Sequence, residues 1–112
     1  MIATTMQAAR LHEVGAPLRI DTVPVPQPGP GQVLIEVEAC GLCGTDIHLA
    51  VAGDIPVSRV PIILGHEAAG TIAALGEGVG GFTIGQRVAL FPSAICGKCR
   101  FCRAGRESLC EA

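Results

Sequence analysis

The stretch Gln-Val-Leu-Ile-Glu-Val-Glu-Ala, residues 32–39, decides the fold class of this chain. Every second side chain is apolar, at Val33, Ile35, Val37 and Ala39. The acidic side chains Glu36 and Glu38 lie between them. Successive side chains of a β-strand point to opposite faces, so this alternation is typical of a strand with one buried face. The stretch therefore predicts a half-buried strand.

Weaker strand patterns lie on both sides of this segment. The further predicted strands are residues 7–13, 18–25, 70–75 and 87–91. Closely spaced prolines and glycines between residues 24 and 31 exclude a helix there, and residues 45–51 are expected to form a short one. A chain of 112 residues has room for one domain with its own core. We therefore expect a mainly β fold, a barrel or a sandwich, with a few short helical turns.

Four cysteines near the end of the chain predict a metal site. Two, two and seven residues separate the members of this quartet, which are Cys96, Cys99, Cys102 and Cys110. Short loops of this kind bring four thiolates around one tetrahedral zinc, and Gly97 and Gly105 suit the tight turns. The basic side chains between the cysteines are expected to favour deprotonated sulfur. The alternative is a disulfide framework, but the clustering and the modest number of cysteines argue against it.

The composition narrows the classes of function. Hydrophobic residues make up 49% and charged residues 16% of the chain, and the mean hydropathy is +0.50, so the surface is expected to meet a partner or a second domain. A net charge of −2, without a basic stripe outside the cysteine-rich end, argues against a nucleic-acid partner. No apolar run is long enough for a membrane span, and no secretory signal is recognisable. Free thiols and zinc favour a reducing compartment, with the cytoplasm as the expected location.

A second group of metal-binding residue types lies upstream of the quartet. The segments Cys43–His48 and Gly65–Glu67 together supply a cysteine and histidines, which suit a catalytic zinc with an open position for substrate. Such a zinc acts as a Lewis acid on a bound alcohol, whose proton then needs a route to solvent. The Thr45 hydroxyl and the His48 imidazole, three residues apart on a helical turn, would form that route.

Three other patterns receive plainer interpretations. Residues 76–81 read Gly-Glu-Gly-Val-Gly-Gly and satisfy a dinucleotide-binding pattern, but no helix is expected after them, so a β-turn is predicted instead. Cys40 and Cys43 form a Cys-x-x-Cys pair that lacks the surroundings of a redox site. His12 is expected to be an exposed bystander.

The Gly-His-Glu segment carries a resemblance to a known family. It is followed at fixed distances by Gly70, Gly76 and Val79. This pattern is similar to the zinc signature of the medium-chain zinc-dependent alcohol dehydrogenases. The chain from Met6 onward resembles their N-terminal GroES-like catalytic domain, which implies a mainly β, GroES-like barrel with short helices and a zinc-binding loop.

The resemblance also implies which residues hold metal. Cys43 and His66 correspond to ligands of the catalytic zinc, and Glu67 to a neighbouring carboxylate that can approach or transiently bind it. Asp46 corresponds to the carboxylate that orients the ligand histidine. The structural zinc would be held by Cys96, Cys99, Cys102 and Cys110.

The implied reaction is the reversible oxidation of a small-molecule alcohol to an aldehyde or ketone, with hydride transfer to NAD or NADP. Thr45 and His48 correspond to the family's proton relay. Residues 1–112 would form an incomplete GroES-like catalytic domain, with residues 92–112 as its structural zinc lobe. The nucleotide-binding (Rossmann) domain and the third protein ligand of the catalytic zinc lie outside this sequence.

We therefore expect a fragment or truncated reading frame that is inactive alone. Its expected partners are the missing domain and, in the full-length form, further copies of itself.

Two alternatives belong to other classes. A non-enzymatic zinc-binding interaction module would keep the quartet but would not need Thr45, Asp46 or His48. A GroES-like co-chaperonin would share the barrel but would need neither metal site.

Overall fold

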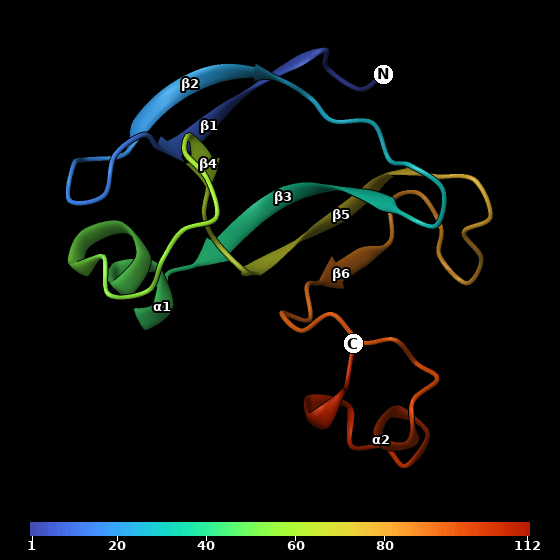
Figure 1. The fold of residues 1–112 in the computed structure, drawn as a ribbon. Helices are drawn as coiled ribbons and strands as arrows, with labels where there is room; N and C mark the ends of the chain where they lie inside the picture. The colour runs from blue at the N-terminus through green and yellow to red at the C-terminus, as the bar shows by residue number, and fades with distance from the viewer.

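The computed structural model describes residues 1–112, which form two antiparallel three-stranded sheets and a C-terminal lobe (Figure 1). The strand order is β2-β1-β4 in the first sheet and β3-β5-β6 in the second. The strands are β1 (Thr5–Leu11), β2 (Arg19–Pro24), β3 (Val33–Gly41), β4 (Ile62–Ile63), β5 (Glu67–Leu75) and β6 (Arg87–Ala89). The prediction of a mainly β fold is confirmed.

The predicted strands correspond to real ones, with shifted ends. The two-residue strand β4 was not predicted, because so short a segment shows no periodicity. Strand β5 begins at Glu67, three residues before the expected start at Gly70. The Gly-His-Glu segment therefore runs directly into a strand, and the pairing of that strand fixes where the segment lies.

Strand β3 is half-buried only in its first three residues, Val33 to Ile35. It pairs with β5 from Val33 opposite Leu75 to Gly41 opposite Glu67, and the register shifts twice on the way. Each shift of this kind disturbs the alternation of side chains along the strand. Residues 36–41 are exposed, and Val37 is 56% exposed, so the predicted half-buried face is wrong for the second half of the strand.

The interior is smaller than the chain length predicts. Only 5 of the 112 residues are buried, and the apolar ones are Ala8, Leu11 and Ile72. A hollow of about 750 Å³ lies between the two sheets, with Met6, Ile35 and Ile72 among its lining residues. The expectation of a sufficient core is therefore wrong. The apolar content lies largely on the surface, as the composition suggested, with Leu42 at 80% exposed.

The helical segments are short. They are α1 (Gly44–Ile47), a π-helical turn η1 (His48–Ala52), α2 (Arg100–Arg103) and a 3-10 turn η2 (Glu107–Leu109). The first two are continuous, which confirms the helix predicted over residues 45–51. None of these segments has the length and apolar character needed to cross a membrane. Figure 1 shows α1 at the end of β3, and α2 in a lobe that stands apart from both sheets.

The glycine-rich segment after β5 forms a turn, as predicted. The Gly76 N–H donates to the Gln32 carbonyl oxygen at 2.8 Å, and a Cβ at Gly76 would collide with the Gly29 carbonyl oxygen. The chain then continues to β6 without a helix. The arrangement lacks the helix N-terminus on which a dinucleotide pyrophosphate would lie.

His12 is not an exposed bystander, and that prediction is wrong. Its Nε2 lies 2.6 Å from Asp21 Oδ2, and its side chain is only 25% exposed. Arg10 Nη1 donates to the same oxygen at 3.2 Å. The Arg10 contact joins β1 to β2, and the His12 contact lies just beyond the end of β1. Both lower the pKa of Asp21, with the His12 hydrogen bond as the largest cause.

Candidate metal centres

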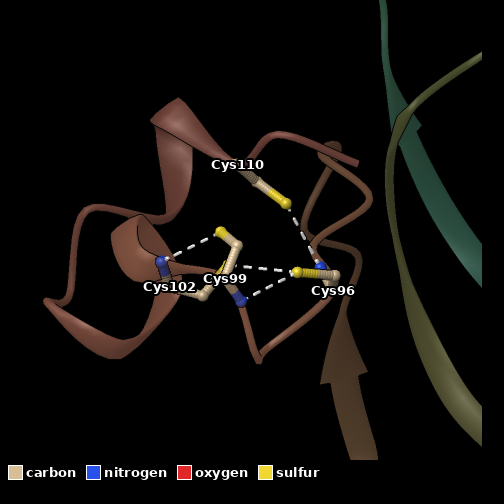
Figure 2. Close-up of side chains that lie close together, drawn as sticks. All are labelled: Cys96, Cys99, Cys102 and Cys110. Carbon is tan, nitrogen blue, oxygen red and sulfur yellow. Dashed lines mark hydrogen bonds between the residues drawn. The ribbon is translucent and has the colours of Figure 1, made fainter.

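The cysteine quartet lies in the C-terminal lobe, where its side chains converge (Figure 2). The four sulfurs all lie within 4.8 Å of one another, and the Cys96 and Cys102 sulfurs are 4.0 Å apart. Four sulfurs around a tetrahedral zinc, each about 2.3 Å from it, are about 3.8 Å apart. The spacing of the quartet is therefore close to that of a zinc cage. All six cysteines are free, which does not agree with a disulfide framework.

Backbone N–H groups point at three of the sulfurs, as Figure 2 shows. The Cys99 N–H donates to Cys96 Sγ at 3.3 Å, the Cys102 N–H to Cys99 Sγ at 3.4 Å and the Cys96 N–H to Cys110 Sγ at 3.3 Å. The loops between them turn at Gly97 and Gly105, both with a φ of 70°. A conformation of this kind favours glycine, which agrees with the tight turns predicted for these two positions.

The chemistry of the quartet fits a cation. Hydrogen bonding from the Cys102 N–H lowers the pKa of Cys99 to about 6, and N–H groups of Ala112 and Cys96 lower that of Cys110. Desolvation and the neighbouring Cys99 sulfur raise the pKa of Cys102 to about 12. Removal from water and the neighbouring Cys99 sulfur thus favour the protonated form of Cys102, so its deprotonation as a ligand needs a nearby positive charge. A divalent ion would supply that charge.

The basic residues of the lobe play a smaller part than expected. Arg100 donates to Glu111, with its Nη2 2.9 Å from Oε1, and its guanidinium lies 4.5 Å from the centre of the Phe101 ring. The causes that lower the pKa of Cys99 and Cys110 are backbone N–H groups and neighbouring thiols. The deprotonation of sulfur is therefore favoured by the fold of the loop rather than by its arginines.

The second cluster forms where β3 ends and β5 begins. The donor atoms of Cys43, His66 and Glu67 all lie within 4.8 Å of one another. They meet because β3 and β5 are antiparallel and Gly41 pairs with Glu67. A Cβ at Gly41 would collide with the Glu67 carboxylate, so the lack of a side chain there makes room for it. The sequence prediction named these three residues for one site but missed Gly41.

Asp46 connects the members of this cluster. It is 5% exposed, and its Oδ2 accepts a hydrogen bond from the Cys43 N–H at 2.9 Å. Its Oδ1 is buried without a hydrogen-bond partner and lies 3.9 Å from His66 Nδ1, which is too long for a hydrogen bond. A buried carboxylate oxygen without a partner is costly. The Asp46 Oδ1 faces His66 and could accept a hydrogen bond from its Nδ1–H if a bound metal fixed the orientation of the ring. The arrangement therefore fits a metal held by these donors.

Of the two predicted relay residues, only Thr45 contacts the cluster, and no hydrogen bond joins it to His48. Thr45 Oγ1 is 3.7 Å from Cys43 Sγ. The His48 imidazole is turned toward Asp54, with Nδ1 2.9 Å from Oδ2 and 3.0 Å from Oδ1. Asp54 was missed, although Gly53-Asp54 directly after a predicted helix is a signal of a chain that turns back there.

Cys40 does not join either cluster. Its sulfur donates to the Gly41 carbonyl oxygen at 3.6 Å and fills the space beside Gly65, where a Cβ would come within 2.8 Å of it. The conformation of Gly65, with a φ of 112°, and this close approach together require glycine before His66.

The fold and the two clusters define a mainly β domain whose donor sets suit two metal ions. The sequence profile described as "Alcohol dehydrogenase GroES-like domain" matches residues 29–112. The chain belongs to this family. Its resemblance to the alcohol dehydrogenases, stated from the zinc signature, is confirmed.

The relatives and solved structures agree with this assignment. The chain is 52% identical over 108 residues to an alcohol dehydrogenase of Rhizobium meliloti, covering 95% of this chain and 32% of the relative. A cobalt- and zinc-bound thermostable alcohol dehydrogenase from Pyrobaculum aerophilum is 35% identical, with a TM-score of 0.89 over 96% of this chain and 33% of that one. Acetophenone reductase from Geotrichum candidum, in complex with NAD, is 36% identical, with a TM-score of 0.83 over 100% and 33%. The chain thus spans about a third of the length of these proteins.

Proposed function

We propose that this chain is the zinc-binding part of the catalytic domain of an NAD- or NADP-dependent alcohol dehydrogenase. The observation that carries the proposal is the cluster of Cys43, His66 and Glu67 beside the buried Asp46. A purely structural zinc domain needs the quartet alone, and nothing in its stability requires a second donor set on the strand ends. Relatives that share this domain are alcohol and sorbitol dehydrogenases.

In this proposal Cys43 and His66 hold the catalytic metal, and Glu67 is the carboxylate that approaches it. A zinc ion bound there supplies Lewis-acid polarisation of the alcohol oxygen. Asp46 fixes the Cys43 loop through the N–H hydrogen bond, and its second oxygen would orient His66 once a metal is bound. A nicotinamide cofactor supplies the hydride acceptor, and the glycine-rich turn at 76–81 is not its binding site, because no helix follows that turn.

The proton of the substrate hydroxyl leaves through side chains of this chain. Thr45, beside Cys43, takes this proton as it gives up its own, and His48, one helical turn further on, receives a proton through a bridging water or hydroxyl, since no hydrogen bond joins the two side chains. His48 is 55% exposed, so it can release the proton to water. The polar groups thus lead from the metal cluster to the surface.

The quartet has a structural role in this proposal. We assign residues 92–112 to a zinc lobe within an incomplete catalytic domain that spans residues 1–112. Its four sulfurs leave no position for substrate, because a tetrahedral zinc with four protein ligands is closed. The substrate is a small alcohol or carbonyl compound that binds at the other cluster.

The test is a chimaera in which this chain replaces the matching segment of the Rhizobium meliloti relative. We expect NAD- or NADP-dependent oxidation of alcohols that falls by at least about a hundredfold in Cys43→Ala, since the metal position is lost. Cys40→Ala is the matched control and should keep the activity. A folded, cofactor-binding chimaera that holds zinc at both clusters but oxidises no alcohol would favour the non-enzymatic zinc module.

A further inference from the structure

We propose that Asp54 is a positioning residue for His48, which holds the imidazole with its proton on Nδ1 and leaves Nε2 free to accept the relayed proton. The use of Nε2 in the relay rests on the proposed function. The contact itself does not, because both carboxylate oxygens of Asp54 lie 2.9–3.0 Å from His48 Nδ1.

The chemistry of the contact selects one tautomer. An ionised carboxylate only accepts hydrogen bonds, so Nδ1 must carry the hydrogen that joins His48 to Asp54. In a neutral imidazole the other nitrogen is then a bare acceptor. His12 is held in the opposite way, since its Nε2 faces Asp21. The two histidines therefore differ in which nitrogen is protonated.

The backbone is shaped to bring Asp54 back to His48. The π-helical turn ends at Gly53, whose φ of 69° is left-handed and whose N–H donates to the His48 carbonyl oxygen at 2.9 Å. Asp54, the next residue, therefore lies beside the side chain of His48, the first residue of the turn. The segment is also anchored, because the Gly15 N–H donates to the Ala50 carbonyl oxygen at 2.7 Å.

Stability does not account for this pair. The side chains of His48 and Asp54 are 55% and 59% exposed. Exposed ion pairs contribute little to the stability of a fold. The left-handed turn instead brings the Asp54 carboxylate back to the exposed His48, where it can hold the imidazole in one orientation.

The proton balance of the step is simple. The Thr45 oxygen takes the proton of the substrate hydroxyl as it gives up its own, and a bridging water or hydroxyl passes a proton on to His48 Nε2, so His48 becomes an imidazolium. Its Nδ1–H stays hydrogen-bonded to Asp54, whose negative charge stabilises the new positive one. The Nε2 proton then passes to water and restores the neutral ring. No proton has to leave Nδ1.

The tautomer can be read directly in the 112-residue chain. We expect the two-bond proton–nitrogen NMR spectrum of the zinc-loaded chain at alkaline pH to show His48 protonated on Nδ1. In Asp54→Ala the population should shift to the Nε2–H form. Asp21→Ala is the matched control, and it should change His12 and leave His48 as it was. An Nε2–H form in the unmodified chain, or an unchanged His48 in Asp54→Ala, would overturn the proposal.

A double-mutant cycle in the chimaera separates positioning from a general structural role. Asp54→Ala should lower kcat/KM about tenfold, the lower end of what loss of a supporting partner costs. In a His48→Gln background it should cause no further loss, because Asp54 acts through that ring. An equal loss in both backgrounds would contradict the proposal. An inactive unmodified chimaera would overturn the proposed function instead, and the NMR result would still decide the role of Asp54.

Discussion

The backbone N–H of Cys43 donates to Asp46 Oδ2 at 2.9 Å, while the other oxygen of this buried carboxylate faces His66 without a hydrogen bond. The Asp46 side chain thus closes the loop that carries Cys43 and also faces the ring of His66. The geometry of the cluster depends on this carboxylate as much as on the donors themselves.

Replacing Asp46 separates these two roles. Asp46→Asn keeps an oxygen for the Cys43 N–H but loses the negative charge beside His66, and we expect the affinity of the second cluster for Co²⁺ to fall about 10–100-fold. Asp46→Ala also loses the hydrogen bond at the start of α1 and should unfold at a lower temperature. Visible absorption of the cobalt-loaded chain measures the first effect, and equal affinity in all three chains would contradict it.

Gly41→Ala tests whether the strand pairing creates the second cluster. The new Cβ would collide with the Glu67 carboxylate, so we expect this carboxylate to move and metal to be lost from that cluster only. Gly44→Ala is the matched control, because a Cβ there meets nothing within 4 Å. Metal analysis of both variants, each with the lobe still loaded, checks the expectation. Full retention in Gly41→Ala would show that the pairing is not required.

Cys99→Ser should remove the tightly held zinc of the lobe. A closed site needs four thiolates. Cys99 has a pKa lowered to about 6, which favours the thiolate form that binds metal. Elemental analysis should find about one tightly bound zinc in the unmodified chain and almost none in this variant. Cys40→Ser should behave like the unmodified chain. Unchanged zinc in Cys99→Ser would count against the cage.

The Asp21 contacts predict an acid-dependent loss of stability. The pKa of Asp21 is lower in the folded chain, chiefly through the His12 hydrogen bond, so the carboxylate stabilises the fold above its unfolded value of 3.8. This contribution is lost as the pH falls below 3.8 toward the lowered value. Thermal melting of Asp21→Asn should therefore differ from the unmodified chain near neutral pH and converge with it in acid. A difference that does not change with pH would exclude this linkage.

The proximity of the four quartet sulfurs could be predicted from the sequence because short spacings constrain them. The quartet is local, so two-residue gaps were enough to indicate a cage. The Gly-His-Glu segment was identified through a family pattern rather than through geometry. The mainly β class also followed from local periodicity, in particular that of residues 32–39.

The supporting residues could not be predicted because they depend on pairings distant in sequence. Gly41 matters only because β3 meets β5 in one register, and Asp54 only because Gly53 reverses the chain. The core was overestimated for a related reason. Composition counts apolar residues, but it does not say that two three-stranded sheets leave many of them uncovered.

The two clusters differ in how much of the chain must be in place before they exist. All donors of the lobe lie within residues 96–110, whereas the other cluster joins the end of β3 to the start of β5. In the proposed function, the lobe would therefore have its complete set of donors as soon as that short segment leaves the ribosome. The second set of donors exists only after two strands have paired, so during biosynthesis the chain meets two different conditions for loading metal.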